Sequence, residues 1–272
     1  MRPLDWMGFI LCAGSLVALI STLELLNGSG SSRFEVVIGV VAIVGFGSAC
    51  ALWFRRAPHP LLTFDALRNQ AFRVSNISGG VYRMVISAVP FLLPLMFQIG
   101  YGWTPIRAGL LVLLLFAGNV AIKPATSPLL RRFGFRPVLI TSVSAGAVMF
   151  VAIALCGPAT PLLLIGAVLV LSGALRSVGF SAYNSLQFAE IEGSAMSAAN
   201  TLASTIQQVA VGLGVAVGAV ILRSADTFAP AESGLRFPYA IAFVLLAVLM
   251  AYPLVDAVRL HRSAGSELVR RD

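Results

Sequence analysis

The sequence predicts an all-α integral membrane protein, a polytopic helical bundle in the lipid bilayer with about eight transmembrane helices. Hydrophobic residues make up 58% of the 272 residues and charged residues only 11%, too little polar surface to coat a water-soluble globule of this size. Apolar runs of about 20 residues, enough to cross a hydrocarbon core of about 30 Å, recur along the chain. Arginines stand mostly in the short segments between these runs and are not gathered on the polar face that nucleic-acid binding requires, so no nucleic-acid partner is expected.

A basic segment between two long apolar runs sets the predicted direction of every span. Residues Leu129–Pro137 read LLRRFGFRP and contain three arginines. Because short arginine-rich loops stay on the cytoplasmic side, this turn is expected inside, and counting spans from it puts both termini in the cytoplasm. The predicted outer segments then hold only Arg33, Arg107, Arg223 and Arg236, and most other arginines fall inside.

The first two apolar runs, residues 6–26 and 35–54, are expected as a helix pair within a unit of residues 1–60. The first run is longer than the apolar part of a signal peptide and lacks a small-residue cleavage pattern, so we interpret it as a helix that stays in the protein. In residues 61–76, apolar side chains alternate with charged ones in a pattern typical of a segment in the headgroup region. We predict that this stretch is an interfacial cytoplasmic linker.

Six further spans make up a predicted unit of residues 77–258, followed by a cytoplasmic tail of residues 259–272. Pro90 and Pro94 break the first of these spans, and in lipid such prolines survive only where neighbouring groups satisfy the freed carbonyls, so this helix is expected in the interior. Small residues around Gly214 and Gly218 predict close helix packing. The expected spans are residues 77–98, 106–122, 138–156, 162–183, 197–222 and 237–258.

Three basic residues, Arg83, Lys123 and Arg176, fall inside predicted spans. An ionisable group in a span is costly and normally faces protein or water. Because successive spans alternate in direction, all three are expected in the cytoplasmic third. Each could reach the headgroups or cap loop carbonyls, or each could belong to a gating or charge network. We favour the first interpretation for Lys123 and the second for Arg176, and Arg83 fits both equally.

Polar side chains open the seventh predicted span, residues 197–222. At helical spacing they share one face, which fits either the hydrophilic wall of a translocation cavity or hydrogen bonds between helices. The candidates on this face are Asn200, Thr201, Ser204, Gln207 and Gln208. In the sixth span, Ser172 and Tyr183 lie along the same side as Arg176 and are also candidates.

Other kinds of site find no support in the sequence. Cys12, Cys50 and Cys156 lie in or at the ends of apolar runs, far apart in sequence, so neither a disulfide framework nor a metal site is expected. No nucleotide-binding or hydrolase motif occurs, and no cofactor is expected. An intramembrane enzyme would need clustered Asp, His or Ser nucleophile pairs within spans, and none occurs. Proton-coupled carriers usually use an acid within the membrane, yet Glu24 and Asp256 stand near span ends.

The segment PLLRRFGFRPVL, residues 128–139, resembles the basic loop motif of major facilitator superfamily carriers. Arg132, Gly134 and Arg136 match the motif, whereas Arg131 stands where an aspartate is common. Other stretches are similar to the fourteen-helix drug:proton antiporter branch of that superfamily. They are RNQAFRV (68–74), PFLLPLMFQ (90–98), AGLL (108–111) and the seventh span from residues 197–200 through 207–208.

Under this resemblance the first two spans look like an extra central helix pair, and the last six look like the C-terminal half of a multidrug-efflux carrier in a bacterial-type inner membrane. It implies alternating access, a small lipophilic or cationic substrate, and protons in the full carrier. The third, fourth, sixth and seventh spans would face the cavity, which adds Ser87 and Asn119 to the candidates, and the fifth and eighth would face lipid. The chain then looks like a half-carrier that needs a separate N-terminal half or a second copy. The alternative is a remnant without transport activity.

Overall fold

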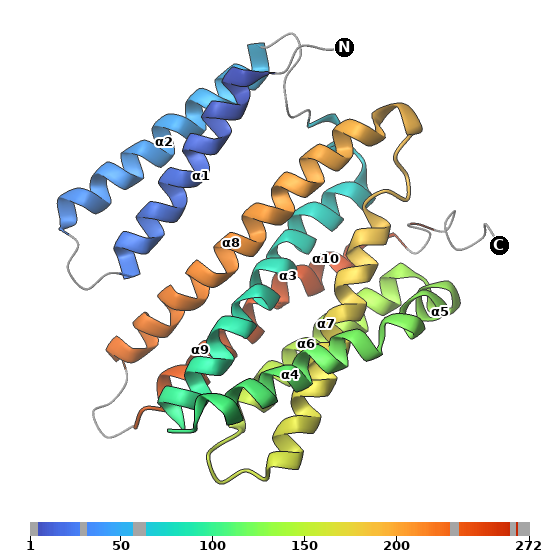
Figure 1. Ribbon diagram of the computed structural model, residues 1–272. Coiled ribbons are helices and arrows are strands. Elements are labelled where there is room, and N and C mark those ends of the chain that lie inside the picture. Colours follow the sequence, from blue (N-terminus) through green and yellow to red (C-terminus); the bar gives the residue numbers. More distant parts are fainter. Residues whose placement is uncertain (1–4, 28–31, 57–63, 229–233, 262–264, 266–272) are drawn as a thin grey trace.

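The computed structural model describes residues 5–27, 32–56, 64–228, 234–261 and 265. All regular structure in this part of the chain is helical, which confirms the predicted all-α class. Six helical segments are long and apolar enough to cross a membrane, and one bent helix pair makes a seventh. The remaining predicted span corresponds to the shorter apolar stretch Trp6–Thr22. Figure 1 shows a bundle of long helices with a two-helix hairpin along one side.

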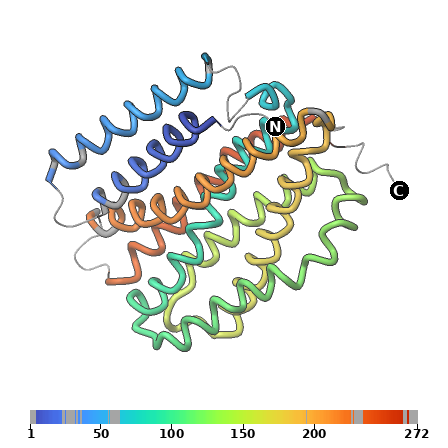
Figure 2. The backbone as a smooth tube through the Cα atoms, turned by 45° about the horizontal axis from the view of Figure 1, so that its top comes forward, coloured from blue at the N-terminus to red at the C-terminus, as the bar shows by residue number. Residues whose placement is uncertain are grey.

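The hairpin consists of α1 (Trp6–Asn27) and α2 (Arg33–Arg56). Glycines let the two helices approach closely, because a Cβ added at Gly14 would lie 2.8 Å from the Phe46 ring and one at Gly39 would lie 2.2 Å from Thr22 Oγ1. Helix α1 packs against α8 (Met196–Phe228), and Figures 1 and 2 both show the hairpin beside α8 on the side away from α3. Only 6% of Val37–Phe54 in α2 is buried, as expected of a helix that contacts one neighbour and otherwise faces lipid.

The hairpin also brings together two cysteines, because the Sγ atoms of Cys12 on α1 and Cys50 on α2 lie 3.2 Å apart. Mild oxidation is expected to join them in a disulfide, since thiols this close need only small side-chain movements to react. The check is to oxidise the protein in membranes, denature it, label the free thiols with a maleimide and count the labels by mass spectrometry. The structure predicts one label, at Cys156. Three labels after oxidation would contradict the packing of α1 on α2.

The long helix α3 (Gln70–Leu95) begins inside the stretch predicted as a linker, residues 61–76, of which residues 61–63 lie outside the described part. A short 3-10 turn, η1 (Asp65–Arg68), precedes it. Asn69 ends the turn and caps the helix, because its side chain accepts a hydrogen bond from the Phe72 amide at 3.0 Å. Phe72 is completely buried. The first turns of α3 therefore belong to the bundle, and the helix starts at Gln70 instead of Ile77.

Helix α3 is the most enclosed of the candidate spans, with 61% of an apolar 18-residue window within Gln70–Gly100 buried, which confirms its predicted interior place. The predicted break at Pro90 does not occur, because the helix runs on to Leu95 and the neighbouring Val89, Leu92 and Leu93 are fully buried against other helices. Only after Pro94 does the winding change, to the π-helix η2 (Met96–Gly100).

The basic segment Leu129–Pro137, predicted as a turn, is mostly helical, so that prediction is wrong. Helix α4 (Pro105–Ala121) bends by 48° into α5 (Lys123–Phe133), and α6 (Phe135–Leu155) follows directly. Thr126 and Leu130 are buried on one face of α5, and this burial stabilises the segment as a helix. The arginines alone had suggested a loop. Gly134, with φ of +77°, is the single residue between the two helices, in a conformation that favours glycine.

Helix α7 (Leu162–Leu186) packs on α4, α6 and α3, and α8 packs on α3. The predicted strip of small residues is confirmed, since a Cβ at Gly214 would lie 2.3 Å from the carbonyl oxygen of Met84. A short 3-10 turn, η3 (Gly193–Ala195), leads into α8. The eighth predicted span comprises α9 (Phe237–Leu249) and α10 (Ala251–Arg259), which follow each other across Met250. The core thus lies among α3, α6, α7 and α9.

Candidate functional site

The polar residues predicted on the seventh span lie along an open face of α8. Helix α8 packs on α3, α9 and α1, and its buried residues are apolar; they include Leu202, Ala203, Ala210, Gly214 and Gly218. The exposed side chains are those of Asn200, Thr201, Ser204 and Gln208, with Gln207 half-buried at the edge. Beyond them the same face becomes apolar, with Val211 and Val215. The open face is therefore polar along the first half of the helix only.

These side chains make no hydrogen bond to another helix within the described residues. Thr201 Oγ1 donates to Ser197 O at 3.0 Å, and Thr205 Oγ1 donates to Thr201 O at 2.9 Å, both within α8. An amide side chain left unpaired in hydrocarbon would cost several kcal/mol. The open face therefore suits water or another polar surface better than lipid.

A second polar group lies in the interior between α3 and α7. The side chain of Arg83 is 1% exposed, and its guanidinium donates to Ser75 O at 3.1 Å and to Asn184 Oδ1 at 2.6 Å. It also lies 5.5 Å from the centre of the Phe180 ring. Within the part of the chain that the structure describes, no carboxylate oxygen lies within 4 Å of this guanidinium. Its buried positive charge is held by neutral acceptors.

Tyr82 and Tyr183 connect Arg83 to the second predicted arginine. The two rings lie 5.4 Å apart, and Tyr82 Oη donates to Arg176 O at 3.1 Å. Several buried polar atoms of this cluster have no partner among the described residues; they include Arg83 Nε, Arg176 Nε and Nη1, Ser75 Oγ, Ser177 Oγ, Tyr183 Oη and Gln187 Oε1. The cluster therefore has spare donors and acceptors that a rearrangement could use.

Several residues that take part in these polar contacts could not be predicted from the sequence. Asn184 accepts a hydrogen bond from Arg83, which lies 101 residues earlier in the sequence. Ser78 donates to the carboxylate of Asp256, which lies 178 residues later. Asn69 donates to Glu190 Oε2 at 3.0 Å and so ties the start of α3 to the connector before α8. Such pairs depend on tertiary packing and leave no local sequence pattern.

The other predicted candidates do not join one cavity. Ser172 and Tyr183 are buried in the interior, whereas Lys123 is exposed at the start of α5. Ser87 lies against Gly214 at the contact of α3 with α8. Asn119 is half-buried where α4 meets α7. A Cβ added to Gly173 of α7 would lie 3.1 Å from the backbone nitrogen of Asn119.

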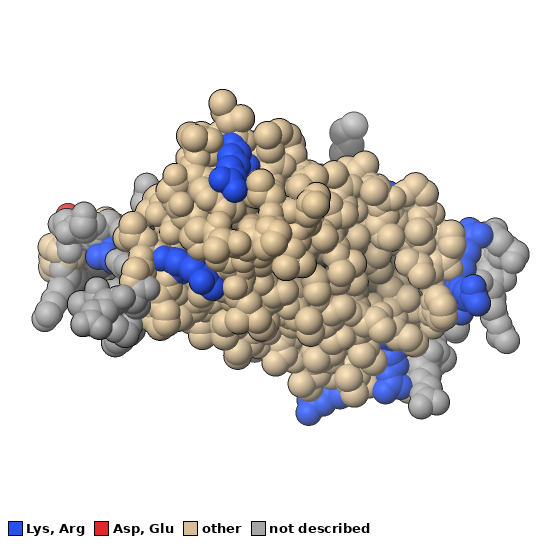
Figure 3. Space-filling model, turned by 90° about the horizontal axis from the view of Figure 1, so that it is seen from below, with Lys and Arg blue, Asp and Glu red and all other residues tan. Residues whose placement is uncertain are grey.

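The loop-motif residues gather where α5 ends and α6 begins. Arg131 and Arg132 are exposed in the last turn of α5, and the Arg132 guanidinium lies 5.4 Å from the centre of the Phe133 ring. Arg136 donates to Val258 O at 2.7 Å and so links α6 to the end of α10. Figure 3 shows Lys and Arg on either side of a broad uncharged band across one face of the molecule.

The opposite end of the bundle carries an aromatic cluster. Trp103 stacks on Phe97 with centroids 5.5 Å apart, and the Arg107 guanidinium lies 3.8 Å from the Trp103 ring centre. Burial raises the pKa of Tyr101 to about 12, so its hydroxyl stays protonated at neutral pH and donates to Cys156 O at 2.6 Å. These residues fix the end of η2 against the end of α6.

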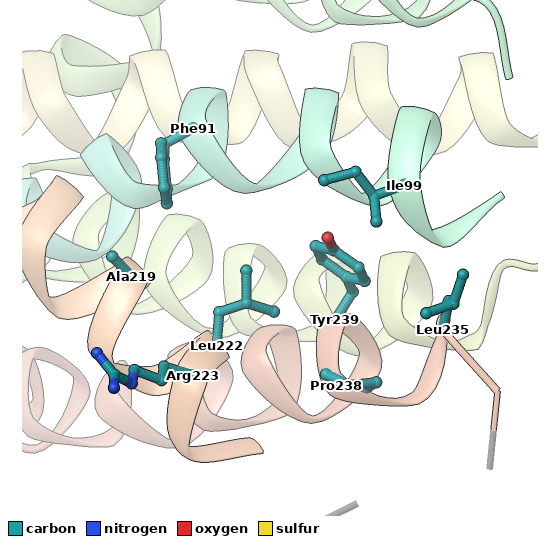
Figure 4. A pocket seen from close by; sticks show the side chains of 8 residues that line it. All are labelled: Phe91, Ile99, Ala219, Leu222, Arg223, Leu235, Pro238 and Tyr239. Atoms are coloured by element: carbon teal, nitrogen blue, oxygen red, sulfur yellow. The ribbon is translucent and has the colours of Figure 1, made fainter. Parts of the chain in front are cut away.

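A pocket of about 440 Å³ opens at this end between α3, η2, α8 and α9 (Figure 4). Tyr239 reaches from α9 toward Ile99, and Arg223 stands at one side (Figure 4). The complete lining is Phe91, Ile99, Ala219, Leu222, Arg223, Leu235, Pro238 and Tyr239. None of the sequence-predicted candidates lies here, and the described residues contain no group of three or more potential metal ligands.

The chain is similar in sequence to known membrane transport proteins. The profile of the Major Facilitator Superfamily matches residues 6–215. The "Probable transport protein HsrA" of Haemophilus influenzae is 28% identical over 271 residues, which cover 98% of this chain and 58% of that protein. The "Putative multidrug resistance protein MdtD" of Cronobacter sakazakii is 30% identical over 228 residues, 81% of this chain and 47% of that protein. The chain thus spans less than two thirds of the length of these relatives.

Proposed function

Because the chain belongs to the Major Facilitator Superfamily, we propose that it forms the C-terminal part of a carrier that exports small lipophilic or cationic compounds by alternating access. The names of the relatives, a transport protein and a multidrug resistance protein, support export as the direction and drug-like molecules as the substrate class. We place the carrier in a bacterial inner membrane with both chain termini in the cytoplasm. Its family accords with a non-enzymatic role.

The observation that carries this proposal is the open polar face of α8. Asn200, Thr201, Ser204 and Gln208 are exposed on a helix whose opposite face is buried in an apolar core. A polar face of this kind is stable in a membrane where it borders water or a second polar wall. A transport pathway between this chain and the other half of the carrier, supplied by a separate N-terminal half or by a second copy, meets that requirement.

The buried arginine cluster is proposed as part of the inner gate. Arg83 and Arg176 lie in the middle parts of α3 and α7, and both have nitrogen atoms without a partner in the described chain. When two halves of a carrier rock against each other, such donors can exchange acceptors at little cost. In this scheme the carboxylate for proton coupling comes from the other half, since Asp256 stands near the end of α10.

The test is to introduce Gln208→Leu into the complete carrier, expressed in its native host. Efflux of a cationic dye is expected to fall roughly fivefold, equivalent to about 1 kcal/mol, because one polar contact with substrate or water is lost. The protein amount, measured by immunoblot, should stay the same. Ser144→Ala is the matched control, since Ser144 Oγ bonds to Ile140 O within α6, away from the open face. Unchanged efflux in Gln208→Leu would assign this face to packing, and wild-type protein without efflux would favour a remnant.

A further inference from the structure

Two neighbouring hollows lie beside the basic corner where α5 meets α6. The larger, of about 570 Å³, is lined by Phe133, Arg136, Pro137, Ile140 and Thr141. The smaller, of about 350 Å³, lies among α5, α6 and α7, and its lining includes Leu129, Leu171, Ala174, Leu175 and Val178. Phe133, Pro137 and Thr141 line both hollows. The two form one divided groove on the outside of the bundle.

The walls of this groove suit hydrocarbon. Apart from Arg136, its polar lining consists of hydroxyls that are already bonded: Thr141 Oγ1 donates to Pro137 O at 2.9 Å and Ser142 Oγ to Leu139 O at 3.2 Å. Away from Arg136 the walls are mostly apolar, and such a hollow holds water poorly and favours an apolar occupant. Phe133 is 53% exposed, although it is a large apolar side chain. A flexible hydrocarbon chain on each side of the Phe133 ring would shield the ring from water.

The rim of the groove is strongly positive. Arg136 lines the larger hollow and uses one nitrogen for Val258 O, which leaves further donors on the same guanidinium. Arg132 stands over Phe133, and Arg131 precedes it. Residues 123–141 contain no Asp or Glu, and no side chain caps the first amides of α6, so the positive end of that helix dipole adds to the field.

We propose that this groove binds a membrane phospholipid with an anionic headgroup. The acyl chains occupy the two hollows on either side of Phe133, and the phosphate is held by Arg132 and Arg136. Guanidinium groups bind phosphate oxygens through paired hydrogen bonds, and a phospholipid supplies the apolar chains and the negative charge in one molecule. The lipid would brace the corner at Gly134, where the chain turns from α5 into α6. The inference rests on the groove and its charges and is independent of the transported substrate.

The test compares phosphatidylglycerol with phosphatidylcholine, which has similar chains but a neutral headgroup. The purified full chain in detergent is titrated with each lipid, and bound lipid is counted by native mass spectrometry. Wild-type protein should bind phosphatidylglycerol about tenfold more tightly or better. Arg132→Gln/Arg136→Gln should lose this preference. Arg68→Gln/Arg107→Gln is the matched control, since it removes two exposed positive charges outside residues 123–141 and should keep the preference.

A second variant covers the case in which the arginine variant does not fold. Ala174→Phe fills the smaller hollow without changing charge and should weaken phosphatidylglycerol binding about tenfold. Inorganic phosphate alone should not compete with the lipid at equal concentration, because it lacks the acyl chains. Equal binding of the two lipids by wild-type protein, or retained preference in Arg132→Gln/Arg136→Gln, would overturn the proposal. So would unchanged binding in Ala174→Phe.

Discussion

Replacing Gly173 with leucine is expected to lower the free energy of unfolding by about 3 kcal/mol or more. At this point α7 touches α4 through backbone: a Cβ on Gly173 would lie 1.9 Å from Leu115 O, and a Cβ on Gly118 would lie 1.9 Å from Val170 O. No rotamer relieves a clash between a Cβ and a backbone carbonyl, so the helices must separate. Thermal unfolding in detergent, followed by the fraction of monodisperse protein, measures the effect.

The matched control is Gly109→Leu on α4, where an added Cβ meets nothing within 4 Å. It should keep or slightly raise stability, because leucine favours a helix more than glycine by roughly 0.5–1 kcal/mol. Gly118→Leu should resemble Gly173→Leu, since the two glycines belong to the same contact. If Gly173→Leu unfolds at the temperature of the control, α4 and α7 do not pack as closely as described.

Arg83→Met is expected to leave the bundle at least as stable as wild type and to reduce export roughly hundredfold, equivalent to about 2.7 kcal/mol. Burying a guanidinium without a carboxylate is costly, and a methionine of similar length fills the space without that cost. The lost hydrogen bond to Asn184 can be replaced by water, because Asn184 is half-buried. Unfolding temperature and dye efflux are measured on the same membrane preparation.

Arg68→Met serves as the control, because Arg68 is exposed and its ion pair, with Asp65 at 3.7 Å, lies within the same turn. Both stability and efflux should be close to wild type there. A less stable Arg83→Met protein that still exports would identify Arg83 as a packing residue. The two readouts therefore separate the gating interpretation from the structural one, which the sequence left equally open.

The sequence was sufficient to locate the long apolar helices, because apolar runs and short loops follow directly from the membrane environment. It located the interior helix through Pro90 and Pro94, which only neighbouring protein can accommodate. It failed at α5, where the arginines suggested a loop. Burial of Thr126 and Leu130 on one face keeps that segment helical as far as Phe133, and the need for a positive φ is confined to Gly134.

The candidate site was predictable only where periodicity carries the information. The polar face of α8 follows from helical spacing, and the structure keeps Asn200, Thr201, Ser204 and Gln208 exposed together. Tyr183 shares a helix side with Arg176 in sequence, but that side turns inward and packs on Tyr82. Contacts between distant segments, such as that of Arg83 with Asn184, required the folded arrangement.

In the proposed carrier, the open face of α8 borders water within the membrane. Single cysteines at Ser204 and Gln208, in protein whose native cysteines are replaced by serine, test it by their rate of reaction with a charged, membrane-impermeant thiol reagent. A cysteine at Val148, exposed on α6 in an apolar stretch, gives the lipid-facing reference. Cysteines at Ser204 and Gln208 should react at least roughly tenfold faster than the cysteine at Val148, because only hydrated thiols ionise to the reactive thiolate. Equally slow reaction at all three positions would contradict it.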